Sequence, residues 1–192
     1  MANKRLGRKR LFSLEKLGKS MTASELGIGA GMEPALVRAT QNREGSIVTT
    51  EIVLNLGTSK GAIASSDTAA NYVIGVSGAS AEIFDSNDAS VFGRILEVEM
   101  VCFEDLATGD DDVILAHHTD KLNGLANGAA ATNTGVDQTD WNAGSADSDA
   151  ITSTPGRYWF LLSGGNDTAG TYSAGKLVIR VTGQVDPENS DI

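Results

Sequence analysis

The sequence predicts a mainly β fold: an antiparallel two-sheet sandwich of jelly-roll type with an extended basic N-terminal arm. Two observations lead to the sandwich. The 192 residues include 22 glycines and only 3 prolines, the composition of short strands joined by turns. Apolar and polar residues also alternate in several segments, as they do in strands with one buried face. About six to eight such segments fit a sandwich or jelly roll.

The clearest alternation lies in residues 176–185, where every second side chain is apolar. Before it comes the apolar run 157–162, separated by a Gly-rich connection that is too short for a crossover helix. We therefore expect these two segments to pair as an antiparallel hairpin. The residues expected on the buried face of 176–185 are Leu177, Ile179, Val181 and Val185.

Further strands are expected at residues 47–56, 72–76, 94–103 and 113–117, with a weaker candidate at 81–84; those at 47–56 and 94–103 have the clearest inward faces. The expected inward residues of the first are Val48, Ile52, Leu54 and Leu56, and those of the second are Leu96, Val98, Met100 and Cys102. Glu97 and Glu99 then fall on a solvated face, and Cys102 is expected to be a buried apolar residue.

Charge divides the chain. Residues 1–43 carry nine Lys or Arg against three Glu, whereas the remainder carries six basic and 22 acidic residues. We therefore expect a docking arm at 1–45, a β-sandwich at 46–185 with a long polar loop at 119–150, and an acidic tail at 186–192. Within the arm, the glycine-rich stretch 27–31 is expected to be a hinge, because it lacks the spacing of a dinucleotide-binding motif.

The arm supplies the candidate partner-binding residues. Leucines three apart could line one face of a short helix, which Gly7 and Gly18 limit to two or three turns, too short to be stable alone. The candidate residues are Lys4, Arg5, Arg8, Lys9, Arg10, Leu11, Phe12, Leu14 and Leu17.

Three partners of the arm can be compared. Nucleic acid is disfavoured, because Phe12 is the only interleaved aromatic and the acidic body repels a polyanion. An organelle-targeting role is disfavoured by Glu15 and Glu25. An acidic protein surface, including that of a neighbouring copy, accounts for both the basic arm and the acidic body.

The sequence predicts no catalytic residues, no metal site and no cofactor. His117 and His118 would point to opposite faces of a strand, beside a solvated acidic turn at 108–112. Residues 85–89 lack the glycine and ligand spacing of a calcium loop. A weak surface Ca²⁺ site would not show as a motif.

The aromatic residues fall into two groups. Trp159 lies in the apolar run 157–162 and is expected in the core, whereas Trp141 lies in the polar loop and is the candidate partner contact there. No apolar run approaches the ~20 residues that span a bilayer, so no membrane partner is expected.

Four segments carry a resemblance to a known group of proteins: residues 4–12, 53–59, 97–104 and 170–179. They resemble small virion-associated proteins of marine tailed bacteriophages. The resemblance implies a β-rich capsid-associated protein, a decoration or cement protein present in many copies, and it brings no catalytic residues.

We therefore expect a non-enzymatic structural protein of the virion capsid, whose partners are the major capsid protein and neighbouring copies of itself. A homotrimer is expected by analogy with similar shell proteins. The alternative is a glycan-binding or structural module of a phage head or tail fibre, with Trp141 and the long loop at its site. A third class, a hydrolase, would need a pocket with convergent carboxylates or His117.

Overall fold

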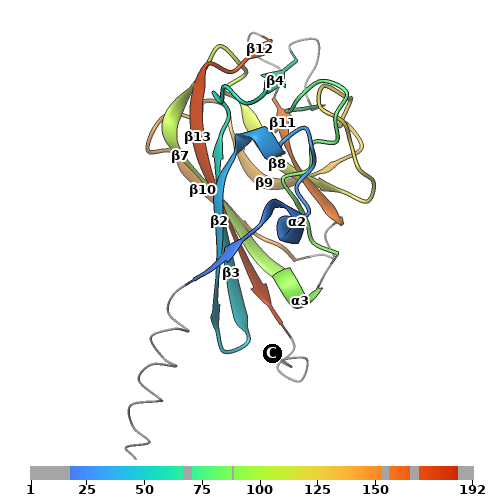
Figure 1. Ribbon diagram of the computed structural model, residues 1–192, viewed down its shortest axis with the longest axis vertical. Coiled ribbons are helices and arrows are strands. Elements are labelled where there is room, and N and C mark those ends of the chain that lie inside the picture. Colours follow the sequence, from blue (N-terminus) through green and yellow to red (C-terminus); the bar gives the residue numbers. More distant parts are fainter. Residues whose placement is uncertain (1–17, 67–70, 88, 153–155, 165–168, 186–192) are drawn as a thin grey trace, which may run out of the picture.

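A computed structural model describes residues 18–66, 71–87, 89–152, 156–164 and 169–185. These residues form mainly antiparallel β-structure (Figure 1), as the sequence predicts. Helical structure in the described ranges is limited to three short segments: α2 (Ala23–Leu26), η1 (Glu33–Ala35, a 3₁₀ turn) and α3 (Ala89–Phe92).

The larger sheet has six strands in the order β1-β2-β3-β13-β7-β10, all antiparallel to their neighbours. Its strands are β1 (Lys19–Met21), β2 (Leu36–Glu44), β3 (Ile47–Asn55), β13 (Ala174–Gln184), β7 (Arg94–Ala107) and β10 (Ala146–Ala150). The long strands β3, β13 and β7 form its centre, where β13 pairs with both of the others along most of its length.

The smaller sheet has five strands, with β5-β11-β8-β9 in order and β6 paired to β11. They are β5 (Tyr72–Val73), β6 (Phe84–Asp85), β8 (Val113–His118), β9 (Thr132–Gln138) and β11 (Tyr158–Ser163). A separate two-stranded ladder joins β4 (Ala64–Ser65) to β12 (Gly170–Thr171) and lies near the top of the view in Figure 1.

Eight of these strands pair in a nested order. Strand β3 pairs with β13, β5 with β11, β7 with β10, and β8 with β9. From β3 to β8 successive members of this set alternate between the two sheets, and from β9 to β13 they alternate again. The first half of the chain therefore runs antiparallel to the second half, strand by strand.

The predicted inward faces of the long strands are confirmed. The named residues of 47–56 and 176–185 are all buried, and in β7 only Leu96 is half-buried instead of buried. Side chains from both sheets belong to one hydrophobic core. Trp159 lies in it as predicted: its ring stacks on Phe84 at 5.0 Å between centroids, and Phe84 contacts Phe92 at 4.9 Å.

The predicted hairpin between 157–162 and 176–185 is wrong. Strand β11 belongs to the five-stranded sheet and β13 to the six-stranded one. The connection between them contains β12, which pairs with β4, so this part of the chain makes its own ladder between the two strands. The short Gly-rich link excludes a helix but does not require its two flanking strands to pair.

The predicted arm boundary at residue 45 is also wrong, because residues 18–45 belong to the folded body. Strand β2 forms a hairpin with β3 through the turn at Gly45, whose φ of 62° suits glycine. Strand β1 adds to the outer edge of β2. Within these residues the buried apolar side chains are Met21, Leu26, Met32, Ala35 and Ala39.

Local signals explain why residues 18–35 fold. Thr22 and Glu25 form a reciprocal capping box at the start of α2. Glu25 also accepts a hydrogen bond from Lys19 at 2.7 Å, and this contact and the cap lower the pKa of Glu25 to about 2. The predicted hinge at 27–31 is packed instead: a Cβ on Gly29 would lie 2.2 Å from the Ser80 carbonyl oxygen.

The predicted loop at 119–150 contains two strands, β9 and β10, so it is not a loop throughout. In β9 only Thr134 and Val136 are buried, and in β10 no residue is buried. Strands with so few buried side chains do not show the alternation from which the other strands were predicted.

Candidate interaction surface

The two sheets differ in how they are covered. Strand β11 is buried at every position, and β8 at every position except His118. By contrast, β3, β7 and β13 bury one face and leave the other, which we call the open face, partly or fully exposed. Within the described ranges, the exposed large apolar side chains all lie on strands of the six-stranded sheet: Phe103 (65% exposed), Val37 (58%) and Ile47 (37%).

A row of valines crosses the centre of the open face. Val178 on β13 pairs with Val53 on β3 and with Val101 on β7. Val178 is buried although it lies on this face, because its neighbours on both sides cover it. The row therefore forms a continuous apolar band across three strands.

Phe103 extends the apolar band along β7. A β-bulge places Cys102 opposite Leu177 and Glu104 opposite Lys176, so Phe103 has no opposite residue on β13. The extra residue of a bulge is free of the ladder and its side chain can be re-aimed. This explains locally why the largest exposed apolar side chain on the sheet lies at this position.

Charged side chains form a second row on the open face. Arg180 on β13 contacts Glu99 on β7 and Glu51 on β3, the latter at 3.7 Å. Arg38 on β2 extends the row, with 3.0 Å between its Nη2 and Glu51 Oε1. These side chains are partly exposed, so each ion pair adds little to stability, on the order of 0–1 kcal/mol. Their fixed alternation of charge instead gives the face a pattern that a partner can match.

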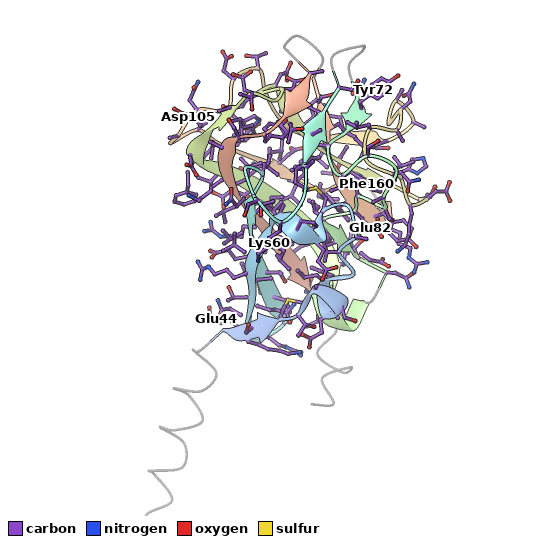
Figure 2. All side chains as sticks on the ribbon, turned by 45° about the horizontal axis from the view of Figure 1, so that its top comes forward. Glu44, Lys60, Tyr72, Glu82, Asp105 and Phe160 are labelled. Carbon is purple, nitrogen blue, oxygen red and sulfur yellow. The ribbon has the colours of Figure 1, made fainter. Side chains whose placement is uncertain are left out.

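Negative charge gathers at one edge of the sheet. Strands β7 and β10 contain one basic side chain, Arg94, against six acidic ones. The acidic residues are Glu97, Glu99, Glu104, Asp105, Asp147 and Asp149. The sequence from 122 to 156, which contains β9 and β10, has no Lys or Arg at all. Figure 2 shows the labelled Asp105 at the periphery of the molecule.

The five-stranded sheet carries its own charged cluster. Two cations lie over the Tyr158 ring, with Lys121 Nζ at 5.3 Å and the Arg157 guanidinium carbon at 4.8 Å from its centroid. Arg157 also binds Asp85, with 3.2 Å between Nε and Oδ1. Cation–π contacts of this kind are worth about 0.5–1 kcal/mol at exposed sites.

Glu82 is the buried anion of this cluster. Its carboxylate is only 1% exposed, with Oε1 2.6 Å from Lys121 Nζ and Oε2 accepting a hydrogen bond from Ser80 Oγ at 2.5 Å. The hydrogen bond to Glu82 raises the pKa of Lys121. These contacts hold the chain near Lys121 against Tyr158 of strand β11. The role of the cluster is therefore structural.

The arm residues Lys4, Arg5, Arg8, Lys9, Arg10, Leu11, Phe12, Leu14 and Leu17 lie outside the described residues. Trp141 is described, and the prediction that it is an exposed partner contact is wrong. Its side chain is 1% exposed, and its Nε1 donates a hydrogen bond to the Val113 carbonyl oxygen at 2.7 Å. The polar residues around Trp141 are exposed, whereas its ring enters the core.

The two histidines take different partners. His117 is buried, and its Nδ1 accepts a hydrogen bond from the Gly156 N–H at 2.8 Å. Burial lowers the pKa of His117. His118 Nδ1 accepts from the Asp120 N–H at 2.9 Å. Within the described ranges no three His, Cys, Asp or Glu side chains gather as a metal site would require.

The acidic turn before β8 is not solvated as predicted. Asp110 is fully buried and Asp112 is 4% exposed. The Asp110 N–H donates to Ser65 Oγ at 2.8 Å, and the Tyr172 hydroxyl donates to the Asp110 carbonyl oxygen at 2.6 Å. Burial raises the pKa of Tyr172 well above its usual range, so this hydroxyl remains a donor. The turn is a packed junction between the sheets and the β4–β12 ladder.

Cys102 is buried, as predicted, and burial raises the pKa of its thiol. Its Sγ lies 3.1 Å from the Glu104 carbonyl oxygen. A neutral, buried thiol of this kind is a packing residue and not a nucleophile.

Sequence reasoning missed Phe103 as a surface residue. The sequence pattern places it only at the end of the strand expected at 94–103. The available signal was its place two residues after Val101 and six after Glu97, on the polar side of the same alternation. A large aromatic on the solvated side of a strand is a signal for an interaction surface.

Comparison with known proteins gives no relative: no protein-family model, no curated protein and no solved structure matches this chain. Among the described residues, no helix has the length and apolar character needed to cross a bilayer.

Proposed function

We propose that this chain is a non-enzymatic structural protein of a virion, a capsid decoration or cement protein of a tailed bacteriophage. In this proposal its partners are the major capsid protein and neighbouring copies of itself, in a homotrimer. The basic arm stabilises the shell, and the β-sandwich carries the contacts between copies.

The strand pairing supports a jelly-roll sandwich as the fold of the body. In a jelly roll, a long antiparallel ribbon of eight strands is wrapped into two sheets. The nested pairs β3–β13, β5–β11, β7–β10 and β8–β9, divided between two sheets with a common core, support this arrangement. Jelly rolls occur in viral capsid proteins and in lectins, so the fold alone does not select the function.

The open face of the six-stranded sheet is the observation that carries the proposal. It combines the 65% exposed ring of Phe103 with a valine band and a row of paired charges. A face of this kind serves contact with another protein better than it serves chemistry.

The fibre-module alternative has lost its main support, because its aromatic, Trp141, is buried. A glycan platform in the 119–150 segment would need another exposed ring. We therefore retain the decoration protein as the proposed function.

The test is co-sedimentation of the full-length protein with shells assembled from the major capsid protein of the same genome. We expect saturable binding and shells that resist heating to a higher temperature. Arg10→Glu should weaken shell stabilisation, whereas Lys60→Glu, the same charge change at an exposed site on the body, should not. Failure to bind the shells at low and moderate salt would overturn the proposal.

A further inference from the structure

The β7–β10 side of the open face forms a low ledge. The register places Ala146, Ser148 and Ala150 of β10 opposite Val101, Glu99 and Glu97 of β7, on the same face. All three β10 side chains are small and exposed, so the surface over β10 is lower than the surface over β7. Phe103 lies at one end of this ledge and the exposed Glu97 at the other.

From this arrangement we propose that the ledge binds residues 4–17 of a second copy of this chain. The inference rests on the proposed function in one respect, that copies of the protein lie side by side. It adds the surface and the segment through which they join.

Charge and apolar content match between the two sides. Residues 4–17 carry six Lys or Arg and one Glu, together with four leucines and Phe12. On this face β7 carries Glu97, Glu99 and Glu104; Glu97 is exposed, whereas Glu99 contacts Arg180 and Glu104 contacts Lys176. The apolar side chains of the segment fit the end of the ledge formed by Phe103, Val101 and Ala146, and its cations fit the exposed carboxylate of Glu97 at the other end.

Recognition at this edge must use side chains, because the β10 backbone is already protected. Asp147 Oδ1 accepts a hydrogen bond from the Ser148 N–H, and Asp149 Oδ1 from the Ala150 N–H, each at 2.9 Å. An incoming strand would have to displace these caps to pair with β10. A segment lying across the face meets no such obstacle.

The register favours a segment from another copy. Gly18 lies beside Asn42, and Lys19 pairs with Gln41, so β1 runs into the body from the end that carries the β2–β3 turn. Phe103 lies at the opposite end of the sheet, near Lys176. Figure 2 shows these two ends by the labels Glu44 and Asp105. The chain therefore enters β1 at the end of the sheet that is farthest from Phe103.

This geometry makes the contact heterologous, with the segment of one copy on the ledge of the next. Such contacts close into rings or extend across a lattice. Fully extended, residues 4–17 span up to about 45 Å, enough to reach a neighbouring body. A ring of three copies would satisfy every ledge and every segment.

The decisive experiment is photocrosslinking in the full-length chain. A benzophenone amino acid replaces Phe103, and the protein is mixed with an isotope-labelled copy before irradiation. We expect crosslinked peptides that join position 103 of one isotope to residues 4–17 of the other. The same probe at Val37, exposed on the far side of the sheet, is the matched control and should not crosslink to that segment.

Three results would overturn the inference: crosslinks to residues 4–17 only within one copy, crosslinks from position 103 to another region, or no crosslink between copies. Association measured by sedimentation gives a second readout. We expect Phe103→Asp and Glu97→Lys each to weaken association at least tenfold, and Val37→Asp to leave it unchanged. If the protein binds shells but shows no contact between residues 4–17 and the ledge of another copy, the inference is refuted and the proposed function stands. If the copies join through this contact but do not bind shells, the proposed function is refuted and the inference stands.

Discussion

The two sheets share one core but differ in what lies on their outer sides. The central strands of the five-stranded sheet, β8 and β11, are buried along both faces. The central strands of the six-stranded sheet bury one face and keep valines, paired charges and Phe103 on the other. The sequence already reflects this: β8 and β11 are continuous apolar runs, and β3, β7 and β13 alternate. The alternating sheet is the one left available to a partner.

The largest expected effect compares two phenylalanines, one from each sheet. Phe160 on β11 is fully buried, whereas Phe103 on β7 is 65% exposed. Phe160→Ala should lower the free energy of unfolding by about 3–5 kcal/mol, and Phe103→Ala by no more than about 0.5 kcal/mol. Urea unfolding, at a protein concentration low enough to avoid association, measures both. Similar losses at the two positions would mean that the open face is covered in solution.

A smaller effect is expected at the ion pair between Lys121 and Glu82, which holds the chain near Lys121 against the five-stranded sheet. Lys121→Met leaves the Glu82 carboxylate buried without its cation, which should cost on the order of 1–3 kcal/mol. Glu82→Gln should cost less, because the Lys121 side chain is 54% exposed and its ammonium returns to water. Thermal unfolding of both variants compares them. The reverse order would show that Glu82 is not buried as a charged group.

The smallest expected effect concerns pH and the buried His117. Burial lowers the pKa of His117 below its usual 6.5, so below that pH the unfolded chain binds a proton that the folded chain does not. Stability from this residue is therefore lost as the pH falls from 6.5 towards the folded pKa. Unfolding midpoints at pH 7.5 and 5.5 should differ less in His117→Asn than in His118→Asn. Equal pH dependence in the two variants would contradict the assignment.

Alternation predicted the strands that bury a full face. Residues such as Val98, Ile179 and Leu54 lie where the two-residue period places them. Strand β2 was missed because its only buried side chain is Ala39, and β10 because it has none. Such strands are held mainly by hydrogen bonds to a neighbouring strand and not by a buried face, so their own sequence lacks the alternation of apolar and polar residues.

Two residues show the same limit for the candidate surface. Trp141 has polar neighbours, yet its ring reaches the core because the chain folds back onto Val113. Phe103 was visible as an outward residue, but the bulge that frees it from the ladder depends on the register with β13. The period of a pattern shows which face a side chain takes. How deeply the side chains of that face are buried depends on chain segments distant in sequence.

The nested strand pairing also has a consequence for biosynthesis. Ile47, at the start of β3, pairs with Gln184, at the end of β13, and β13 also completes the ladder of β7. The centre of the six-stranded sheet therefore cannot form on the ribosome until residue 184 has left the exit tunnel. Contacts so distant in sequence make folding slow. Until then β3 and β7 each keep an unpaired edge, and a nascent chain crowded among its siblings can pair such an edge with the wrong copy.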